Sequence, residues 1–228
     1  MLRRILGVAA VTVAAGFAVA GCAPVKMGAA AIVGSNRITI ATLDTEAGML
    51  AAAQKKNPSA QGGLTQQEIT QATLTWLIRF QISDQLASQN GISVDATQSQ
   101  TAQQDLLVSE AEQEGVPTSS VKLGSVMIGA GIPPNLTSEL DRYLAVADAY
   151  ETAANGGTAP SSQSAQTAAQ DKYNHATCVA AKSLNIQVNP QFGQMSYTSY
   201  TVIAAADTVS RPSGTSPSTS PGGLTPAC

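Results

Sequence analysis

Few residues of this chain are of types that could do chemistry, and they lie far apart. There is one histidine, His175, in an alanine-rich helical segment, and no Gly-x-Ser-x-Gly elbow accompanies it as a nucleophile. Metal sites need compact groups of His, Cys, Asp or Glu, which this sequence does not offer. Glu110 and Glu114 lie one helical turn apart, but a solvated acidic helix face explains this pair better than glycoside chemistry does. We therefore expect no enzyme activity, no catalytic residue, no metal and no cofactor.

The N-terminal segment indicates export. Met1-Leu2-Arg3-Arg4 is a basic start, and the apolar run that follows is shorter than a typical membrane-spanning helix. The run ends in Val19-Ala20-Gly21-Cys22, which resembles the lipobox of bacterial lipoproteins; the alternative is an ordinary secretory signal with a chance cysteine. The resemblance implies that residues 1–21 are a signal peptide and that Cys22 becomes a lipidated N-terminus. Two or three acyl chains there would anchor the protein stably to the extracytoplasmic side of the cell membrane.

Two cysteines remain after Cys22, namely Cys178 and Cys228. An exported protein folds in an oxidising compartment, where paired cysteines persist. The sequence leaves two readings open, a Cys178–Cys228 disulfide or free or intermolecular thiols.

The composition indicates a lean core and excludes one class of partner. Of 228 residues only 12% are charged and 4% aromatic, so few large side chains anchor the interior. The formal net charge is −3, and loss of Arg3 and Arg4 with the signal peptide would make it −5. A mildly acidic chain with few charges has no electrostatic footprint for nucleic acid.

A central helix over 65–90 is the strongest structural prediction. Thr65 and Glu68 have the spacing of a capping box, and Gly91 suits the left-handed position after a helix end. At about 100° per residue the apolar side chains fall on two sides, so we expect the helix to be covered on both. One group is Ile69, Trp76, Phe80 and Ala87, and the other is Leu74, Ile78, Ile82 and Leu86.

Further helices are expected before and after it. Thr39 or Thr42 would cap the first, Asp95 would cap an exposed, glutamine-rich helix that Gly115 ends, and Ser119 or Ser120 would cap a short helix to Ile128. The expected helices cover 41–56, 96–114, about 120–128, 136–155 and 165–183.

Short strands are expected near both ends of the folded part. Ile32 and Val33 precede a turn at 34–37, Ile186 and Val188 alternate with polar residues, and a second extended piece covers 197–204. The segment 206–228 is rich in Pro, Ser, Thr and Gly and is predicted to be disordered.

Four features together resemble the SurA/PrsA-type extracytoplasmic chaperones, and more closely their actinobacterial lipoprotein relatives. These are the lipobox at Cys22, an opening A-x-V-G-x-x-x-I-T at 31–39, a G-I-x-V hinge at 91–94 and a closing V-N-P-x-F-G at 188–193. The resemblance implies a mainly α, SurA-like helical body in which an N-terminal strand meets a strand from near the C-terminus.

The resemblance also fixes what is missing. Many members carry a parvulin prolyl-isomerase domain between the long helices and the closing helix, where this chain has only a linker over about 156–166. We therefore expect a chaperone body without isomerase activity. The implied organisation is a signal peptide at 1–21, a tether at 22–28, a helical domain at 29–205 and a tail at 206–228.

The resulting hypothesis is a lipid-anchored, ATP-independent chaperone, or holdase, for unfolded exported polypeptides. Its crevice between helices would be lined by the apolar stretch 127–134 and the neighbourhood of Trp76, with Met127, Ile128 and Ile132 as candidate contacts. The other interpretation of this stretch, and the more usual one for such patterns, is a packed helix end. The alternative is a non-enzymatic envelope scaffold that binds one dedicated partner, and an unrecognised envelope hydrolase is the least favoured. The sequence leaves the oligomeric state open.

Overall fold

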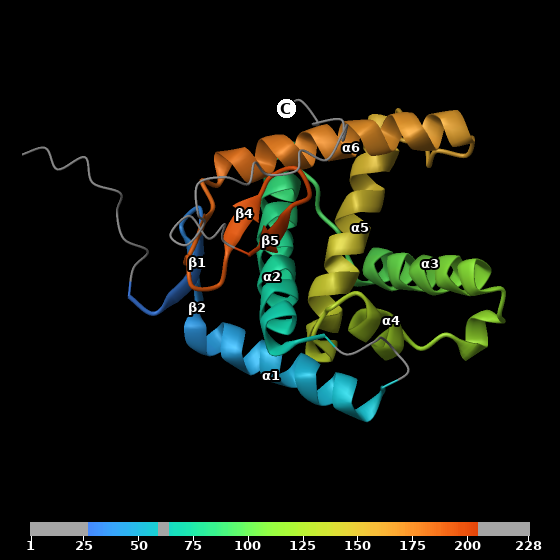
Figure 1. Ribbon diagram of the computed structural model, residues 1–228. Helices are drawn as coiled ribbons and strands as arrows, with labels where there is room; N and C mark the ends of the chain where they lie inside the picture. Colours follow the sequence, from blue (N-terminus) through green and yellow to red (C-terminus); the bar gives the residue numbers. More distant parts are fainter. Residues whose placement is uncertain (1–26, 59–63, 205–228) are drawn as a thin grey trace, which may run out of the picture.

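The computed structural model describes residues 27–58 and 64–204, and over these ranges the chain is mainly helical with a small amount of antiparallel sheet (Figure 1). The mainly α fold class expected from the sequence is therefore confirmed. Cys22 and the segments proposed as signal peptide and tail lie outside the described residues. Within the described ranges, no helix combines the length and the apolarity needed to cross a bilayer.

Helix α2, Gln66–Asn90, stands at the centre of the fold (Figure 1). The capping box predicted at its start is present, because the Thr65 N–H donates to Glu68 Oε2 at 2.7 Å and the Glu68 N–H donates to Thr65 Oγ1 at 3.3 Å. Gly91 ends the helix in the left-handed region, with φ of 63°. Local sequence signals therefore fix both ends of α2.

Three hydrophobic clusters meet along α2. Leu74, Ile78, Ile82 and Leu86 all belong to the largest cluster, as one predicted face. The residues of the other predicted face do not share one cluster, since Ile69, Phe80 and Ala87 each lie in a different cluster. A helix of 25 residues is ~37 Å long at 1.5 Å per residue, so it passes several partners in turn.

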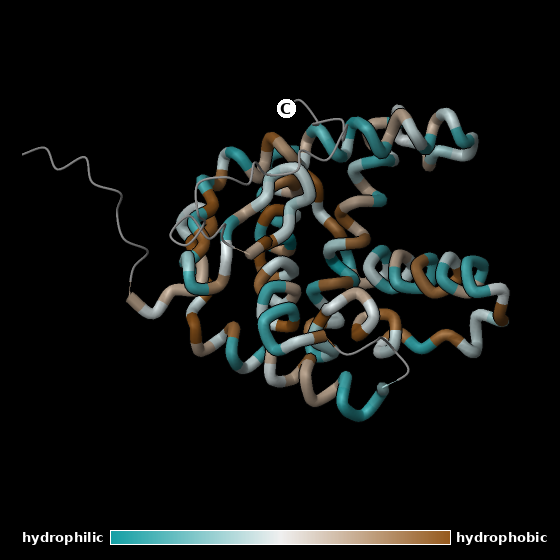
Figure 2. The backbone as a smooth tube through the Cα atoms, in the orientation of Figure 1, coloured by the Kyte–Doolittle hydropathy of each residue, from teal (hydrophilic) through white to brown (hydrophobic). Residues whose placement is uncertain are grey.

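Helices α1, α5 and α6 pack against α2, and α3 packs against α5 (Figure 1). Thr39 caps α1 by accepting from the Thr42 N–H, Asp95 and Gln98 form a capping box at α3, and Ser162 caps α6. Hydrophobic residues concentrate along α2 and β1 rather than along α3 (Figure 2). Besides α2, the α-helices of the described residues are α1 Ile40–Lys56, α3 Ala96–Glu114, α4 Leu123–Gly129, α5 Thr137–Ala154 and α6 Gln163–Ser183.

The short helix α4 begins later than the sequence predicts. Thr118–Ser120 form a single 3-10 turn, and Val121 then adopts an extended conformation, with ψ of 127°. This interrupts the helix, so neither Ser119 nor Ser120 caps it, and Lys122 precedes α4 without a side-chain cap.

A three-stranded antiparallel sheet closes the chain on itself. Strands β1 Ala29–Val33, β2 Asn36–Thr39 and β3 Gln187–Val188 lie in the order β2-β1-β3. Ala31 pairs with Ile38 on one side and with Val188 on the other. The predicted meeting of an early strand with a late strand is therefore present.

The last extended segment is a hairpin rather than one extended piece. Strands β4 Gln194–Ser196 and β5 Thr201–Ile203 are antiparallel. Residues 197–200 between them form a turn, although the sequence predicts them to be extended. Arg79 of α2 holds this turn, since its Nε donates to Tyr200 O and its Nη2 donates to Ser199 O, both at 3.1 Å. The Val202 N–H also donates to Thr75 Oγ1 at 2.8 Å, so α2 positions the hairpin through contacts distant in sequence.

Candidate functional site

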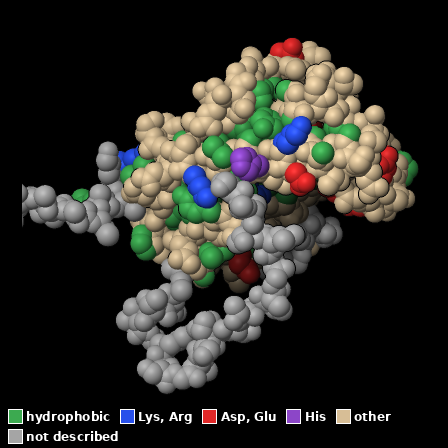
Figure 3. Space-filling model, turned by 90° about the horizontal axis from the view of Figure 1, so that it is seen from above, with side chains coloured by type: hydrophobic (Ala, Val, Ile, Leu, Met, Phe, Trp, Pro, Cys, Tyr) green, Lys and Arg blue, Asp and Glu red, His purple; other side chains and the backbone are tan. Residues whose placement is uncertain are grey.

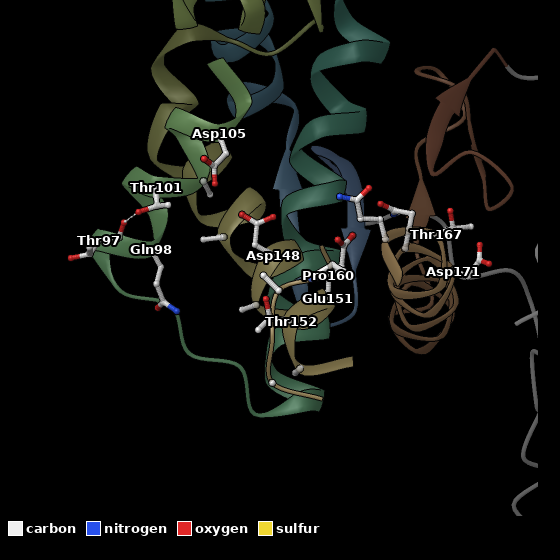
Figure 4. Close-up of a pocket in the computed structure, with 18 residues that line it drawn as sticks. Thr97, Gln98, Thr101, Asp105, Asp148, Glu151, Thr152, Pro160, Thr167 and Asp171 are labelled. Atoms are coloured by element: carbon white, nitrogen blue, oxygen red, sulfur yellow. Dashed lines mark hydrogen bonds between the residues drawn. The ribbon is translucent and has the colours of Figure 1, made fainter. Parts of the chain in front are cut away.

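An open crevice lies between α3, α5 and the start of α6, with a volume of about 1130 Å³ (Figure 4). Helices α3 and α5 form two of its walls, and the loop after α5 with the first turns of α6 forms the third. Asp105 from α3 and Asp148 from α5 both face into it (Figure 4). Ligand pockets for small molecules usually enclose about 300–1000 Å³, so this opening suits a larger or extended ligand.

Local sequence signals build these walls. The capping box of Asp95 and Gln98 starts α3, and the segment expected as a plain linker shapes the third wall. Gly156 and Gly157 take positive φ angles of 79° and 86°, which turn the chain sharply after α5. Lys172 Nζ of α6 donates to Ala154 O at 2.8 Å and ties the two helices together.

The chemistry of the crevice combines small apolar side chains with polar and acidic ones. Thr and Gln side chains supply donors and acceptors, and the described lining contains no Lys, Arg or His. The crevice therefore favours a partner that brings apolar groups, backbone amides and positive charge. The small apolar lining residues are Ala102, Ala145, Ala149, Ala153, Ala159 and Pro160, and the acidic ones are Asp105, Asp148, Glu151 and Asp171.

Partial enclosure changes the acidity of two of these carboxyls. Desolvation raises the pKa of Asp148, and the nearby Asp105 carboxylate raises it further. Desolvation also raises the pKa of Glu151, with Asp148 as the second cause. A cation bound in the crevice would favour the charged form of both groups.

Local sequence patterns do not indicate this site. They favour a solvated acidic face for Glu110 and Glu114 of α3 and assign no role to Asp105 or Asp148. A usable signal is the spacing of Ala145, Asp148 and Ala149, which puts small residues and a carboxylate on one side of α5, where a neighbouring helix can approach closely.

The four residues predicted to contact clients lie elsewhere, and three of them are core residues. Met127, Ile128 and Ile132 are 1%, 3% and 2% exposed. Trp76 is half-buried, and its ring centroid lies 5.7 Å from that of Phe80 and 5.7 Å from that of Tyr143. Its Nε1 donates to Ala130 O at 2.9 Å. Met127 and Ile132 therefore do not line an open crevice in this structure, because they fill the cluster that fixes α4 against α2 and α5.

Ile128 reaches the edge of a second, smaller groove. This groove of about 670 Å³ lies between α1 and α4, and Met49, which is 44% exposed, belongs to its lining. Lys56 and Lys122 are its charged lining residues. Part of the region expected to form a crevice thus has a surface opening, but a different set of side chains forms it.

The remaining chemistry-bearing residues do not converge. His175 is exposed on α6, on a face where charged side chains are sparse (Figure 3). Cys178 is 2% exposed and disulfide-bonded. Cys22 and Cys228 lie outside the described residues, so the pairing of Cys178 with Cys228 stays a prediction. Over 27–58 and 64–204, no group of three His, Cys, Asp or Glu is placed to hold a metal ion.

Comparisons with models of known protein families, with curated proteins and with solved structures find no match to this chain. The fold and the crevice therefore carry the functional argument, together with the sequence motifs.

Proposed function

We propose that this protein is a lipid-anchored, ATP-independent holdase that assists exported polypeptides outside the cell membrane and has no prolyl isomerase activity. The observation that carries the proposal is the open crevice of about 1130 Å³ between α3, α5 and α6. An open surface that mixes apolar and polar groups can bind an extended chain reversibly. Release of the chain then requires no nucleotide.

The lining suggests which segments the crevice would prefer. Alanine and proline side chains offer shallow apolar contact, while threonine and glutamine side chains can pair with backbone amides. Four carboxylates without a lining cation favour segments that carry Lys or Arg. The proposed clients are therefore extended segments of mixed apolar and basic composition.

The proposed anchor would keep the crevice close to the membrane surface. An extended chain spans at most ~3.6 Å per residue. The tether between Cys22 and Ala29, where the sheet begins, would therefore span no more than ~25 Å. Newly exported chains would then meet the domain soon after they emerge.

The test is suppression of aggregation. Citrate synthase is heated with the purified protein lacking residues 1–22, and light scattering is followed at several-fold molar excess of the proposed holdase. Ala153→Phe, at an exposed position lining the crevice, should weaken suppression, while Ala41→Phe, at an exposed position of α1 outside it, should not.

Two results would overturn the proposal. One is undiminished aggregation at every ratio tested. The other is suppression that Ala153→Phe leaves unchanged, which would move the activity away from the crevice. Recovery of a single stable envelope partner by pull-down, with no affinity for unfolded chains, would favour the alternative of a dedicated scaffold.

A further inference from the structure

A small cavity lies where α2, α5, α6 and the β4–β5 turn meet. Its volume is about 170 Å³, equivalent to about five or six water molecules at ~30 Å³ each. Arg79 and Ser83 come from α2, Tyr143 from α5, Tyr173 and Thr177 from α6, and Tyr200 from the turn. The cavity is separate from the acidic crevice, with which it shares no lining residue.

Buried hydroxyls in this cavity have no partner among the described residues. Ser83 is 6% exposed, and its Oγ forms no hydrogen bond; the same holds for the buried Tyr200 hydroxyl. Buried polar groups are normally satisfied, and leaving one without a partner is unfavourable. Two such hydroxyls beside one cavity indicate that a polar group belongs there.

The backbone of Tyr200 adds an independent sign. Its φ is 50°, in the left-handed region that non-glycine residues seldom occupy. Arg79 holds this conformation by donating to the carbonyl oxygens of Ser199 and Tyr200. Conformations of this kind persist where the surroundings impose them and cluster at ligand sites. Here the conformation accompanies a buried Tyr200 hydroxyl at the cavity wall.

The charge of the lining indicates the type of ligand. Arg79 supplies a positive charge, and no Asp or Glu is among the described lining residues. The adjacent Asp84 is already paired with Arg142 at 2.8 Å. Burial, followed by the neighbouring Tyr143, raises the pKa of Tyr173, and burial raises the pKa of Tyr200, so both phenols keep their protons at neutral pH and can donate. A guanidinium with several hydroxyl donors complements an oxyanion.

We propose that this cavity binds a small oxyanion, of the carboxylate or phosphate type, between Arg79 and the hydroxyls of Ser83 and Tyr200. The bound anion would bridge α2 and the hairpin. The site does not depend on the holdase function and would stand if that function were disproved.

Trp76 provides a direct readout. It is the only tryptophan of the chain, and the Arg79 guanidinium carbon lies 4.9 Å from the centre of its ring. An anion that binds Arg79 changes the charge beside the indole, so it should change the emission of Trp76. Phosphate, sulfate and acetate are titrated separately against sodium chloride at equal ionic strength.

The expected result is a saturable change in emission with at least one oxyanion and none with chloride, accompanied by a rise in Tm. Response to acetate alone assigns a carboxylate ligand, and response to phosphate or sulfate alone assigns a tetrahedral oxyanion. The double variant Ser83→Ala with Tyr200→Phe keeps Arg79 and every aromatic ring. It should lower the affinity for the anion at least tenfold. Tyr197→Phe, a phenol of the same hairpin outside the cavity lining, is the matched control.

Two outcomes would overturn the proposal. No saturable response to any of the three oxyanions at tens of millimolar would mean that the cavity holds only water. A response of unchanged affinity in the double variant, with far-ultraviolet circular dichroism unchanged, would place the anion elsewhere on the protein.

Discussion

At the scale of single residues, the crevice disfavours the charged form of two of its carboxyls, Asp148 and Glu151. Asp148 and Glu151 have raised pKa values because partial enclosure disfavours their charge and neighbouring carboxylates add repulsion. A site of this kind gives up some stability when empty and recovers it when a cation binds.

This repulsion predicts how stability depends on pH. The folded-state pKa of Asp148 lies above its usual value, so between the two values the folded state binds more protons than the unfolded state. The contribution of Asp148 to stability should therefore increase as the pH falls from neutral through the raised pKa. Asp148→Asn should raise the Tm at pH 7 and reduce this acid-side gain, as measured by thermal unfolding across a pH series.

The control for this prediction is Asp44→Asn, at an exposed position of α1 outside the crevice. It should leave the pH profile of the wild type in place. A Tm for Asp148→Asn below that of the wild type at pH 7 would mean that the carboxylate makes a stabilising contact instead.

At the scale of elements, α2 carries the fold because it contributes to every hydrophobic cluster. Helix α3 is different, since only Ala102 and Ala111 are buried along its 19 residues. The two helices have capping boxes of the same kind, so packing rather than local sequence distinguishes their importance.

The cap of α2 gives a first prediction at this scale. Thr65→Ala removes the side-chain acceptor of the Glu68 N–H and should destabilise the protein by ~1 kcal/mol, the usual cost of losing an N-cap. Urea unfolding measures the change, and Thr65→Ser, which keeps the hydroxyl, should stay near the wild type. An unchanged midpoint for Thr65→Ala would mean that tertiary contacts alone start the helix there.

The core face of α2 gives a second. Ile78 is 0% exposed within the largest cluster, so Ile78→Ala should cost about 2–5 kcal/mol through lost burial and a residual cavity. Val108→Ala on α3, where the side chain is 42% exposed, should stay within about 0.5 kcal/mol of the wild type. The measurement is the urea midpoint at constant m-value. Comparable losses in the two variants would contradict the central place of α2.

At the scale of the whole molecule, the chain is closed by contacts between its early and late parts. Asn189 follows β3, and its N–H donates to Ala30 O at 2.9 Å while its Nδ2 donates to Ala29 O at 3.1 Å. Ala29 and Ala30 are fully buried, so their carbonyls depend on these donors. The Asn-Pro pair that ends the strand in the sequence thus also fastens the N-terminal strand.

This closure predicts a measurable loss when the amide is removed. Asn189→Ala would leave the Ala29 carbonyl without its side-chain donor and should cost about 1–3 kcal/mol in urea unfolding. Gln191→Ala, at an exposed position two residues further on, should have little effect. An equal midpoint for Asn189→Ala and the wild type would show that the sheet closes without the amide.

The sequence by itself determined the ends of α2 and α3, because caps and left-handed glycines act within a few residues. It narrowed the cap of α1 to Thr39 or Thr42, of which Thr39 is the cap, and it did not predict the Ser162 cap of α6. It also placed the early and late strands, because β-branched residues beside Gly, Asn and Pro are local signals. The faces of α2 were only half predicted: periodicity groups side chains around an axis, but it does not show that Ile69 and Phe80 have different partners along that axis.

Only the tertiary structure decided where function is proposed. The sequence leaves the stretch around Met127 and Ile132 as either a packed helix end or a crevice wall, and the structure packs both side chains in the cluster beside Trp76. The acidic crevice needs α3, α5 and α6 in one place, and the small cavity beside Arg79 needs the hydrogen bond from Arg79 to a turn 120 residues away in sequence. Both sites arise from side chains that meet only after folding, and no local rule records such meetings because the free energy that creates them comes from packing between distant segments.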